Sequence, residues 1–181
     1  MIQDRDFPVA AANPWSMLWI WVPLIAAILV IVCSRGQATA QTNIAASGSL
    51  LLFLLVLGAA LTWLYGRRRI GLQGRELQIT ATLYRKRVPV DALDLANARI
   101  VDLAEHTDLR PLFKTNGFGM PGFAAGHFRL RDMRKAFCLL TDRSRMLALP
   151  LRDGTLLLLS PEKPQALLQQ LQELADQDLR H

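Results

Sequence analysis

The sequence contains few of the residues on which metal binding and nucleophilic catalysis usually depend. Its 181 residues include two cysteines and three histidines, and the histidines lie far apart in the chain. None of these residues has the spacing of a metal site, and the nucleophile motif G-x-S-x-G does not occur. We therefore expect no catalytic residues, no metal ion and no cofactor, and an enzyme is the least favoured class of function.

Charged residues are absent from two long apolar segments in the N-terminal part of the chain, residues 15–33 and 44–66. At a rise of about 1.5 Å per residue, a helix of either length crosses a hydrocarbon core of roughly 30 Å. We expect two transmembrane helices with aromatic anchors near their ends. These anchors are Trp15, Trp19, Trp21, Trp63 and Tyr65.

Two alternatives to a pair of membrane spans stay open for these segments. The hairpin could be buried in a globular core, although both segments lack the polar stripe of a soluble helix. The first segment could instead be a signal peptide, with Ala38 and Ala40 in an A-x-A-like cleavage site. Such a leader would have an acidic N-terminal region and an unusually long apolar run, which argues against cleavage.

The distribution of lysine and arginine predicts the orientation of the chain. Of the 21 Lys and Arg residues, only Arg5 and Arg35 precede residue 67. Because positive residues favour the cytoplasmic side, we expect a multi-pass protein of the bacterial inner (cytoplasmic) membrane with its C-terminal domain in the cytoplasm. The expected order is a cytoplasmic tail 1–14, helix 15–33, outer connection 34–43, helix 44–66, basic juxtamembrane linker 67–73, folded domain 74–177 and tail 178–181.

The folded domain is predicted to contain short strands followed by one amphipathic helix. Alternating or short apolar runs predict strands within residues 75–80, 82–90, 97–104, 126–131, 135–142, 145–151 and 155–160. Asp153–Gly154 is a hairpin signal between the last two, and the series suggests a meander of antiparallel strands. Leu167, Leu171 and Leu174 recur at helical spacing, with Ser160 or Pro164 marking the start of the helix.

The stretch TNGFGMPGFAAG, residues 115–126, contains the spacing G-x-G-x-x-G. A dinucleotide site needs a helix directly after the glycines, whereas a strand pattern follows Gly122. We therefore interpret the stretch as a structural loop whose glycines permit positive φ and close backbone approach. Its aromatic residues form either a lid on the sheet or an exposed surface for a partner. The candidate loop or partner-contact residues are Asn116, Gly117, Phe118, Gly119, Pro121, Gly122, Phe123 and Gly126.

Three features of the C-terminal part occur together: the glycine-rich residues 116–126, Thr141–Asp142, and the residues LLLSP at 157–161 with the helix that follows. With these features, the C-terminal part resembles the bacterial pleckstrin-homology-like (PH-like) domain family found behind two membrane helices. The resemblance covers roughly residues 74–175 and implies a seven-stranded PH-like antiparallel β-barrel capped by a C-terminal helix. The expected fold is therefore an α+β membrane protein. Met133–Arg134 stands where a glycine-containing turn would be easier, and Lys163 where an acidic helix cap would fit better.

Two basic clusters provide the candidate contacts with lipid or phosphate. They are Arg67, Arg68 and Arg69, and Arg85, Lys86 and Arg87. On a strand, Arg85 and Arg87 share one face while Lys86 points to the other. The favoured function is a non-enzymatic, membrane-anchored binding or scaffolding module that presents the domain to a membrane or cytoplasmic protein. The alternative is a sensor of anionic lipid headgroups that uses these basic residues.

The remaining expectations concern packing and partners. Membrane lipids surround the two spans, and no nucleic-acid partner is expected. Gly58 and Thr62 form a small-xxx-small pair, which is consistent with helix packing within the hairpin or in a homo-oligomer. Cys138 lies in an apolar strand, where a core position is favoured over a reactive thiol.

Overall fold

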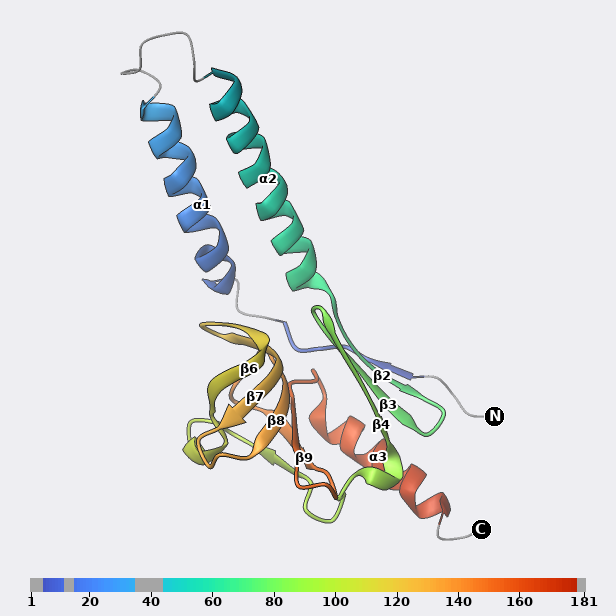
Figure 1. Cartoon of the computed structure of the whole chain (residues 1–181). Coiled ribbons are helices and arrows are strands. Elements are labelled where there is room, and N and C mark those ends of the chain that lie inside the picture. Colours follow the sequence, from blue (N-terminus) through green and yellow to red (C-terminus); the bar gives the residue numbers. More distant parts are fainter. Residues whose placement is uncertain (1–4, 12–14, 35–43, 179–181) are drawn as a thin grey trace. The chain divides into compact units, whose positions relative to one another are not determined.

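The computed structural model describes residues 5–11, 15–34 and 44–178 (Figure 1). The chain divides into two compact units. The helical unit, Pro14–Gly66, contains α1 (Trp15–Ser34) and α2 (Ile44–Gly66). The β unit, Met1–Asn13 with Arg67–His181, contains the described strands and the C-terminal helix α3 (Pro164–Asp178). The helical unit is thus an insertion within the chain of the β unit.

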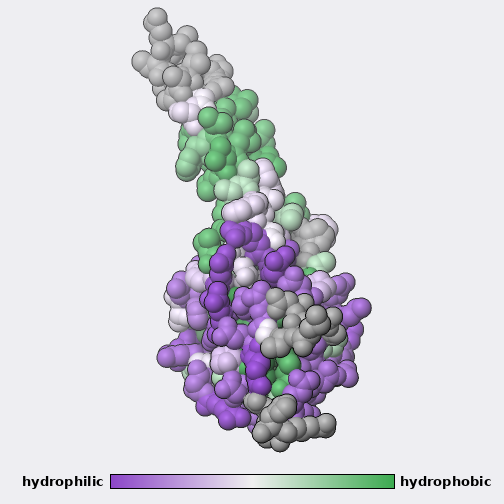
Figure 2. All heavy atoms as spheres, turned by 90° about the vertical axis from the view of Figure 1, so that its right-hand side faces the viewer, coloured by the Kyte–Doolittle hydropathy of each residue, from purple (hydrophilic) through white to green (hydrophobic). Residues whose placement is uncertain are grey.

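Most large side chains of the helical unit are exposed. Within the described residues, Gly48–Gly66 is the one helical segment long and apolar enough to cross a membrane, and Met17–Cys33 is apolar but shorter. Figure 2 shows apolar surface concentrated on the helices, whereas the visible face of the β unit is mostly hydrophilic. The large exposed side chains of the helices include Trp15, Trp19, Val30, Leu52, Phe53 and Trp63.

Gly58 lies where α2 packs against α1. A Cβ atom at this position would lie 3.1 Å from Leu24 Cδ1 and 3.2 Å from Trp21 Cη2. The Thr62 hydroxyl donates a hydrogen bond to the Gly58 carbonyl, at 2.8 Å. The sequence left open whether this pair serves packing within the hairpin or in a homo-oligomer. In the structure, Gly58 serves packing within the hairpin.

The first sheet of the β unit has four antiparallel strands in chain order. They are β1 (Arg5–Phe7), β2 (Arg68–Gln73), β3 (Glu76–Ala81) and β4 (Tyr84–Pro89). Ile70, Ile79 and Lys86 are directly paired across β2, β3 and β4, so they point to one face of the sheet. Residues 67–73, expected as a linker, contain β2 because Ile70 and Leu72 alternate into the core, where they are 0% and 2% exposed.

The N-terminal segment is part of the β unit through a connection that we call the N-terminal strap, residues 5–10. Its strand β1 pairs with β2, for example at Phe7 and Ile70. Beyond β1, the Glu162 amide donates to the Pro8 carbonyl and the Ala10 amide donates to the Ser160 carbonyl, both at 2.9 Å. The strap, which lies in the segment expected as a tail, therefore joins the edge of the first sheet to the chain just before α3.

The second sheet has six strands in the order β5-β9-β10-β8-β7-β6. Their bounds are Arg99–Val101 (β5), Pro111–Met120 (β6), Phe123–Leu130 (β7), Lys135–Leu140 (β8), Met146–Pro150 (β9) and Leu156–Leu159 (β10). The expected antiparallel meander is wrong at β10, which lies between β9 and β8 and runs parallel to β8. All four leucines of β10 are buried, and a strand apolar on both faces needs a central position.

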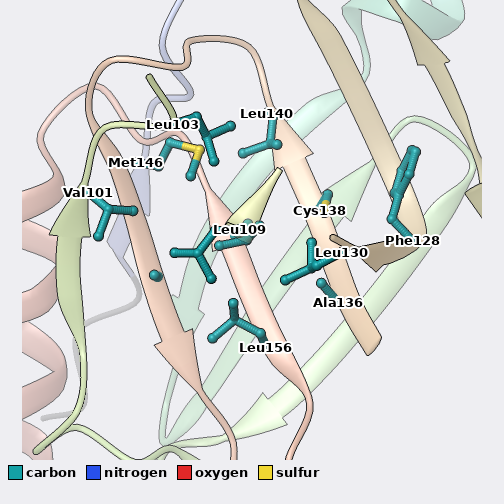
Figure 3. Close-up of a cluster of buried hydrophobic side chains, with 12 residues drawn as sticks. Val101, Leu103, Leu109, Phe128, Leu130, Ala136, Cys138, Leu140, Met146 and Leu156 are labelled. Carbon is teal, nitrogen blue, oxygen red and sulfur yellow. The ribbon is translucent and has the colours of Figure 1, made fainter. Parts of the chain in front are cut away.

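Both faces of the six-stranded sheet are covered. One face carries a cluster that includes Phe128, Cys138 and Leu158, and it is covered by Leu103 and Leu109 from the connection between β5 and β6 (Figure 3). That connection contains the short 3₁₀ helix η2 (Thr107–Leu109). The opposite face contacts the four-stranded sheet, where Lys86 lies over the Phe137 ring. Cys138 is fully buried and has the core position expected for it.

Helix α3 confirms the amphipathic helix at the C-terminal end. It begins at Pro164, the second of the two expected starting points. Leu167 and Leu171 are 0% exposed, because they point into the domain, whereas Leu174 is partly buried. The helix contacts β9 and the 3₁₀ helix η1 (Val90–Ala92) that follows β4.

The strand pairing of the described residues gives two sheets rather than one closed barrel. Ten strands are present among these residues, against the seven that the resemblance implies. On one side, the strap connects the sheets through an isolated bridge between Val9 and Pro161. On the other side, side chains make the connection, since the Tyr84 hydroxyl of β4 donates to Asn116 Oδ1 of β6 at 2.9 Å.

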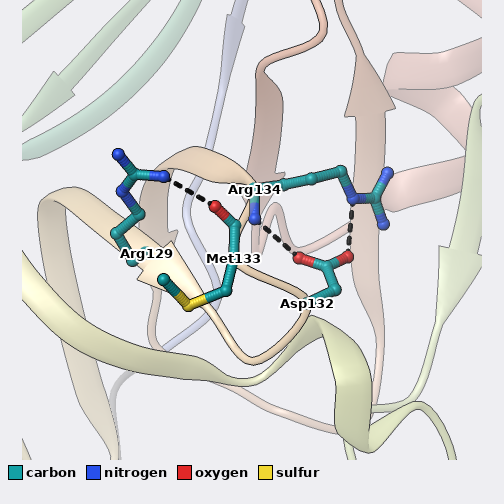
Figure 4. A network of polar contacts seen from close by, with 4 residues as sticks. All are labelled: Arg129, Asp132, Met133 and Arg134. Atoms are coloured by element: carbon teal, nitrogen blue, oxygen red, sulfur yellow. Dashed lines mark hydrogen bonds and ion pairs between the residues drawn. The ribbon is translucent and has the colours of Figure 1, made fainter.

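The turn between β7 and β8 has the difficulty expected for Met133. This residue has φ of 66°, a conformation that residues other than glycine, asparagine and aspartate seldom adopt. Polar contacts hold the turn (Figure 4): Arg129 Nη1 donates to the Met133 carbonyl at 2.8 Å, and Arg134 Nε donates to Asp132 Oδ2 at 2.6 Å. The Arg134 amide also donates to Asp132 Oδ1, at 3.0 Å.

Candidate binding surfaces

The basic triplet of β4 is divided between the two faces of its sheet. Arg85 and Arg87 are exposed on the outer face, while Lys86 is half-buried on the inner face. This alternation agrees with the strand pattern read from the sequence. Arg85 pairs with Thr80, and Thr80 pairs with Arg69 of β2, so Arg69 and Arg85 lie in one row on the outer face. We call Arg69, Arg85 and Arg87 the basic sheet face.

The arginines that follow α2 are divided in the same way. The Arg68 guanidinium lies over the Phe123 ring, 5.7 Å from its centroid, and thus between the two sheets. Arg69 lies on the outer face and is 3.8 Å from the Asp6 carboxylate of β1, with both side chains largely exposed. Exposed ion pairs contribute at most about 1 kcal/mol, so Asp6 leaves Arg69 accessible to an anionic ligand.

A second basic site lies between the sheets around Lys86, in a cavity of about 280 Å³. The Lys86 Nζ atom lies 5.8 Å from the centroid of the Phe137 ring. The His127 ring is packed edge-on against the same ring, with centroids 5.0 Å apart. Lys135 and Arg129 also line the cavity, which makes it suited to an anionic group.

Burial sets the ionisation of this cavity. Desolvation lowers the pKa of the Lys86 ammonium, and the charge of Asp153 opposes that shift. Burial and the neighbouring positive charge of Lys86 lower the pKa of His127. A bound anion would raise the pKa values of both Lys86 and His127, because its negative charge would compensate the positive charge of Lys86.

The glycine stretch is a β-hairpin, since β6 and β7 flank the turn at Pro121–Gly122. Gly117 and Gly126 are directly paired across the two strands. A Cβ atom on Gly126 would lie 2.7 Å from Gly117 Cα, and one on Gly117 would lie 2.9 Å from the Ala125 carbonyl oxygen. The glycines therefore permit close approach of the two strands, and a strand rather than a helix follows them.

The aromatic residues of this hairpin have a mixed environment. Phe123 is 2% exposed and belongs to the core. Phe118 is partly buried and packs against Phe123, with ring centroids 6.0 Å apart. Gly119 and Pro121 are exposed, and a Cβ atom on Gly119 would lie 3.5 Å from the Phe128 ring. Whether the hairpin contacts a partner stays a prediction.

The chemistry of the remaining nucleophiles is limited by burial. Ser160 and Lys163 have the S-x-x-K spacing of some acyl-transfer enzymes. However, Ser160 is 0% exposed and its hydroxyl donates to the Asp142 carbonyl at 2.8 Å, which is a structural role. Burial also raises the pKa of the Cys138 thiol, which disfavours the reactive thiolate. No group of potential metal-binding side chains occurs within residues 5–11, 15–34 and 44–178.

The sequence reasoning missed the strand β6 and the surface that it forms. Leu112 and Phe113 are 48% and 59% exposed, so the segment lacks the buried alternation by which a strand is usually recognised. β6 is the last strand of its sheet, and within the described residues it pairs with β7 alone. A signal was available, because a strand predicted at 126–131 that follows a proline–glycine turn implies a preceding partner strand.

The β unit therefore consists of two sheets in contact and a C-terminal helix, with several polar sites on its surface. The family model described as "Bacterial PH domain" matches residues 68–175, more than half of the chain, and the chain belongs to this family. Its PH-like domains are generally non-catalytic binding or scaffolding modules. The match begins at β2, so it leaves out the N-terminal strap. No curated protein and no solved structure matches the sequence.

Proposed function

We propose that this protein is a membrane-anchored, non-enzymatic PH-like module that binds a protein partner in the cytoplasm. The anchor is the helical hairpin, and the binding element is the edge of the six-stranded sheet formed by β6. The observation that carries the proposal is the exposure of Leu112 and Phe113 on this edge strand. Edge strands offer unpaired backbone groups to an added strand, while exposed side chains select the partner.

The order of the strands supports two membrane crossings. Strand β1 precedes α1 and strand β2 follows α2, yet these strands pair in one sheet. If α2 alone crossed the bilayer, β1 and β2 would lie on opposite sides and could not pair. The large apolar side chains exposed on both helices favour lipid as their surroundings. The excess of arginine after α2 then favours a cytoplasmic β unit.

The edge of β6 is selective rather than generally adhesive. The register with β7 shifts between Pro111 and Phe113 and again between Lys114 and Asn116. Bulges and an exposed lysine are features that prevent uncontrolled pairing of edge strands. A partner must therefore complement a particular irregular edge, which suits a scaffold with a defined binding protein.

Photo-crosslinking in the native membrane tests this proposal. A photoreactive amino acid replaces Phe113 in the full chain, and the control position is Leu83, which is 69% exposed on the turn between β3 and β4. We expect a specific protein adduct from position 113 and none of the same mass from position 83. Absence of a protein adduct at position 113 would contradict a protein-binding function of β6.

The second candidate function is recognition of anionic lipid headgroups by the basic sheet face. It is favoured by the row formed by Arg69 and Arg85, with the exposed Arg87 on the same strand face. To test it, Cys33 is replaced by serine and Cys138 by alanine, and a fluorophore is attached to Thr80→Cys. Quenching of this fluorophore by labelled lipids is then measured in nanodiscs. Stronger quenching with anionic than with neutral lipid, lost with added salt and in Arg85→Gln/Arg87→Gln, would support this function. Equal quenching in both lipids would exclude it.

A further inference from the structure

A cavity of about 400 Å³ lies beneath the curved strand β6, on the face of the six-stranded sheet that carries the Leu158 cluster. Pro111 and Met120, the two ends of β6, both line it. This requires β6 to bend, and its two register shifts with β7 provide the bend. Phe128 and Leu140 form an apolar floor, so the cavity combines an arched edge strand with part of the core surface.

Two arginines give this cavity its charge. Arg110 and Arg143 line it, and no acidic residue lines it among the described residues. Arg110 Nε donates to the Leu103 carbonyl at 2.8 Å, which fixes the side chain and leaves the two terminal nitrogens of its guanidinium for other acceptors. Arg143 is exposed, and its guanidinium has no hydrogen-bond or ion-pair partner within the described part of the chain.

The neighbouring carboxylates are already engaged by their own turns. Asp142 accepts hydrogen bonds from the Ser144 amide and hydroxyl, at 3.0 and 2.9 Å, and these hydrogen bonds lower its pKa. Asp102 accepts a hydrogen bond from the Ala104 amide at 2.6 Å. Within the described residues, neither Asp102 nor Asp142 forms an ion pair with Arg110 or Arg143, and the positive charge of these arginines favours an anionic ligand above an apolar floor.

We propose that this cavity binds an acidic–apolar segment of the protein partner. A carboxylate of the segment pairs with Arg143 and Arg110, and an adjacent large apolar side chain contacts Phe128 and Leu140. This inference rests on the proposed protein-binding function and names the chemistry that the partner must have. The volume lies within the range of small-ligand sites, and the adjacent edge of β6 can hold an extended peptide backbone.

The experiment places the photoreactive amino acid at Met120, which lines the cavity and is partly exposed, in the full chain in native membranes. The adduct is mapped to the crosslinked peptide by mass spectrometry. The same chain is then made with Arg143→Gln, and with Arg152→Gln as a matched control, because Arg152 is an exposed arginine outside the cavity. Protection of the buried Cys138 thiol from a maleimide reagent shows that each variant is folded.

The expected result is a protein adduct whose peptide contains an acidic residue beside a large apolar residue. Arg143→Gln should reduce this adduct about tenfold, the loss expected for one charge-assisted hydrogen bond, while Arg152→Gln leaves it unchanged. A lipid adduct, a peptide without an acidic residue, or an adduct insensitive to Arg143→Gln would overturn the inference. Adducts at position 113 without any at position 120 would overturn the proposed binding role of the cavity but not the protein-binding function of β6. Absence of adducts at both positions would overturn both proposals.

Discussion

Replacement of Gly126 by alanine should destabilise the β unit much more than the same replacement at Gly154. Both residues have positive φ, 110° at Gly126 and 80° at Gly154. An alanine in such a conformation costs about 1–2 kcal/mol. The two positions differ in their surroundings, because a Cβ atom meets nothing within 4 Å at Gly154.

At Gly126 the added methyl group has no space. It would lie 2.7 Å from Gly117 Cα, 2.8 Å from the Asn116 carbonyl oxygen and 3.0 Å from Tyr84 Cδ2. Two of these are backbone atoms, so β6 and β7 must separate. Overpacking costs about 1–3 kcal/mol in addition to the cost of an alanine at positive φ. We therefore expect Gly126→Ala to lower the free energy of unfolding by about 2–5 kcal/mol in total. Gly117→Ala, whose backbone does not have positive φ, should show the overpacking cost alone, since its Cβ would lie 2.9 Å from the Ala125 carbonyl oxygen.

The assay must report on the β unit alone. All four tryptophans lie in residues 15–63, so tryptophan fluorescence follows the helical unit instead. Cys138 is fully buried in the β unit, and with Cys33→Ser it is the single thiol of the chain. Its rate of maleimide labelling in nanodiscs measures how often the domain opens.

Each loss of about 1.4 kcal/mol in the free energy of unfolding should raise the rate of Cys138 labelling about tenfold. Gly154→Ala should therefore label about tenfold faster than the parent chain, and Gly126→Ala about thirtyfold to several thousandfold faster. Equal rates for the two variants would refute the claim that the glycines permit close strand approach. A wild-type rate for Gly117→Ala would refute it independently.

Three further predictions use the same chain. Met133→Gly should slow Cys138 labelling about two- to fivefold, because glycine adopts the positive φ of the turn without strain. The greater entropy of glycine in the unfolded chain offsets part of this gain. Met133→Ala keeps the strain and should not slow the labelling. Because the folded-state pKa of His127 is lowered, the unfolded chain binds the proton more strongly, and stability should fall as pH decreases below about 6.5. His127→Phe should flatten that dependence in labelling rates normalised to a free thiol, and an unchanged slope would contradict the assignment. Topology reporters fused to the two termini should both report the cytoplasm, because the β1–β2 pairing requires both strands on one side and the arginines after α2 favour the cytoplasmic side. Reports from opposite sides would refute the two-span proposal.

The local features of the β unit were accessible from sequence because each depends on neighbouring residues. Leu167 and Leu171 predicted the buried face of α3, and Arg85 and Arg87 predicted the exposed face of β4. The strained turn at Met133 was anticipated from the absence of glycine alone. Periodicity reports which side of an element is buried, and it does so without knowledge of the partner element.

The order of the strands in the sheets was harder to predict from the sequence, because strand pairing depends on residues far apart in the chain. In its position between β9 and β8, β10 pairs Leu156 with Ala136, which precedes β9 in the chain. Strand β6 is an edge strand with exposed apolar residues, so its sequence carries neither the alternation nor the buried run of a strand. Strand β1 has only three residues and lies before the helical hairpin, where nothing in its local sequence indicates a partner in β2.

Composition and residue spacing were sufficient to predict the apolar helices, the strands with clear alternation, the C-terminal helix and the resemblance to PH-like domains. Only the folded domain shows which basic residues share a face, how the strap links the sheets, and that Arg110 and Arg143 line one cavity. Arg110 and Arg143 lie on connections separated by three strands, β6, β7 and β8, and the bend of β6 encloses the space that they line. Such proximity follows from chain folding and strand pairing, which local residue patterns do not encode.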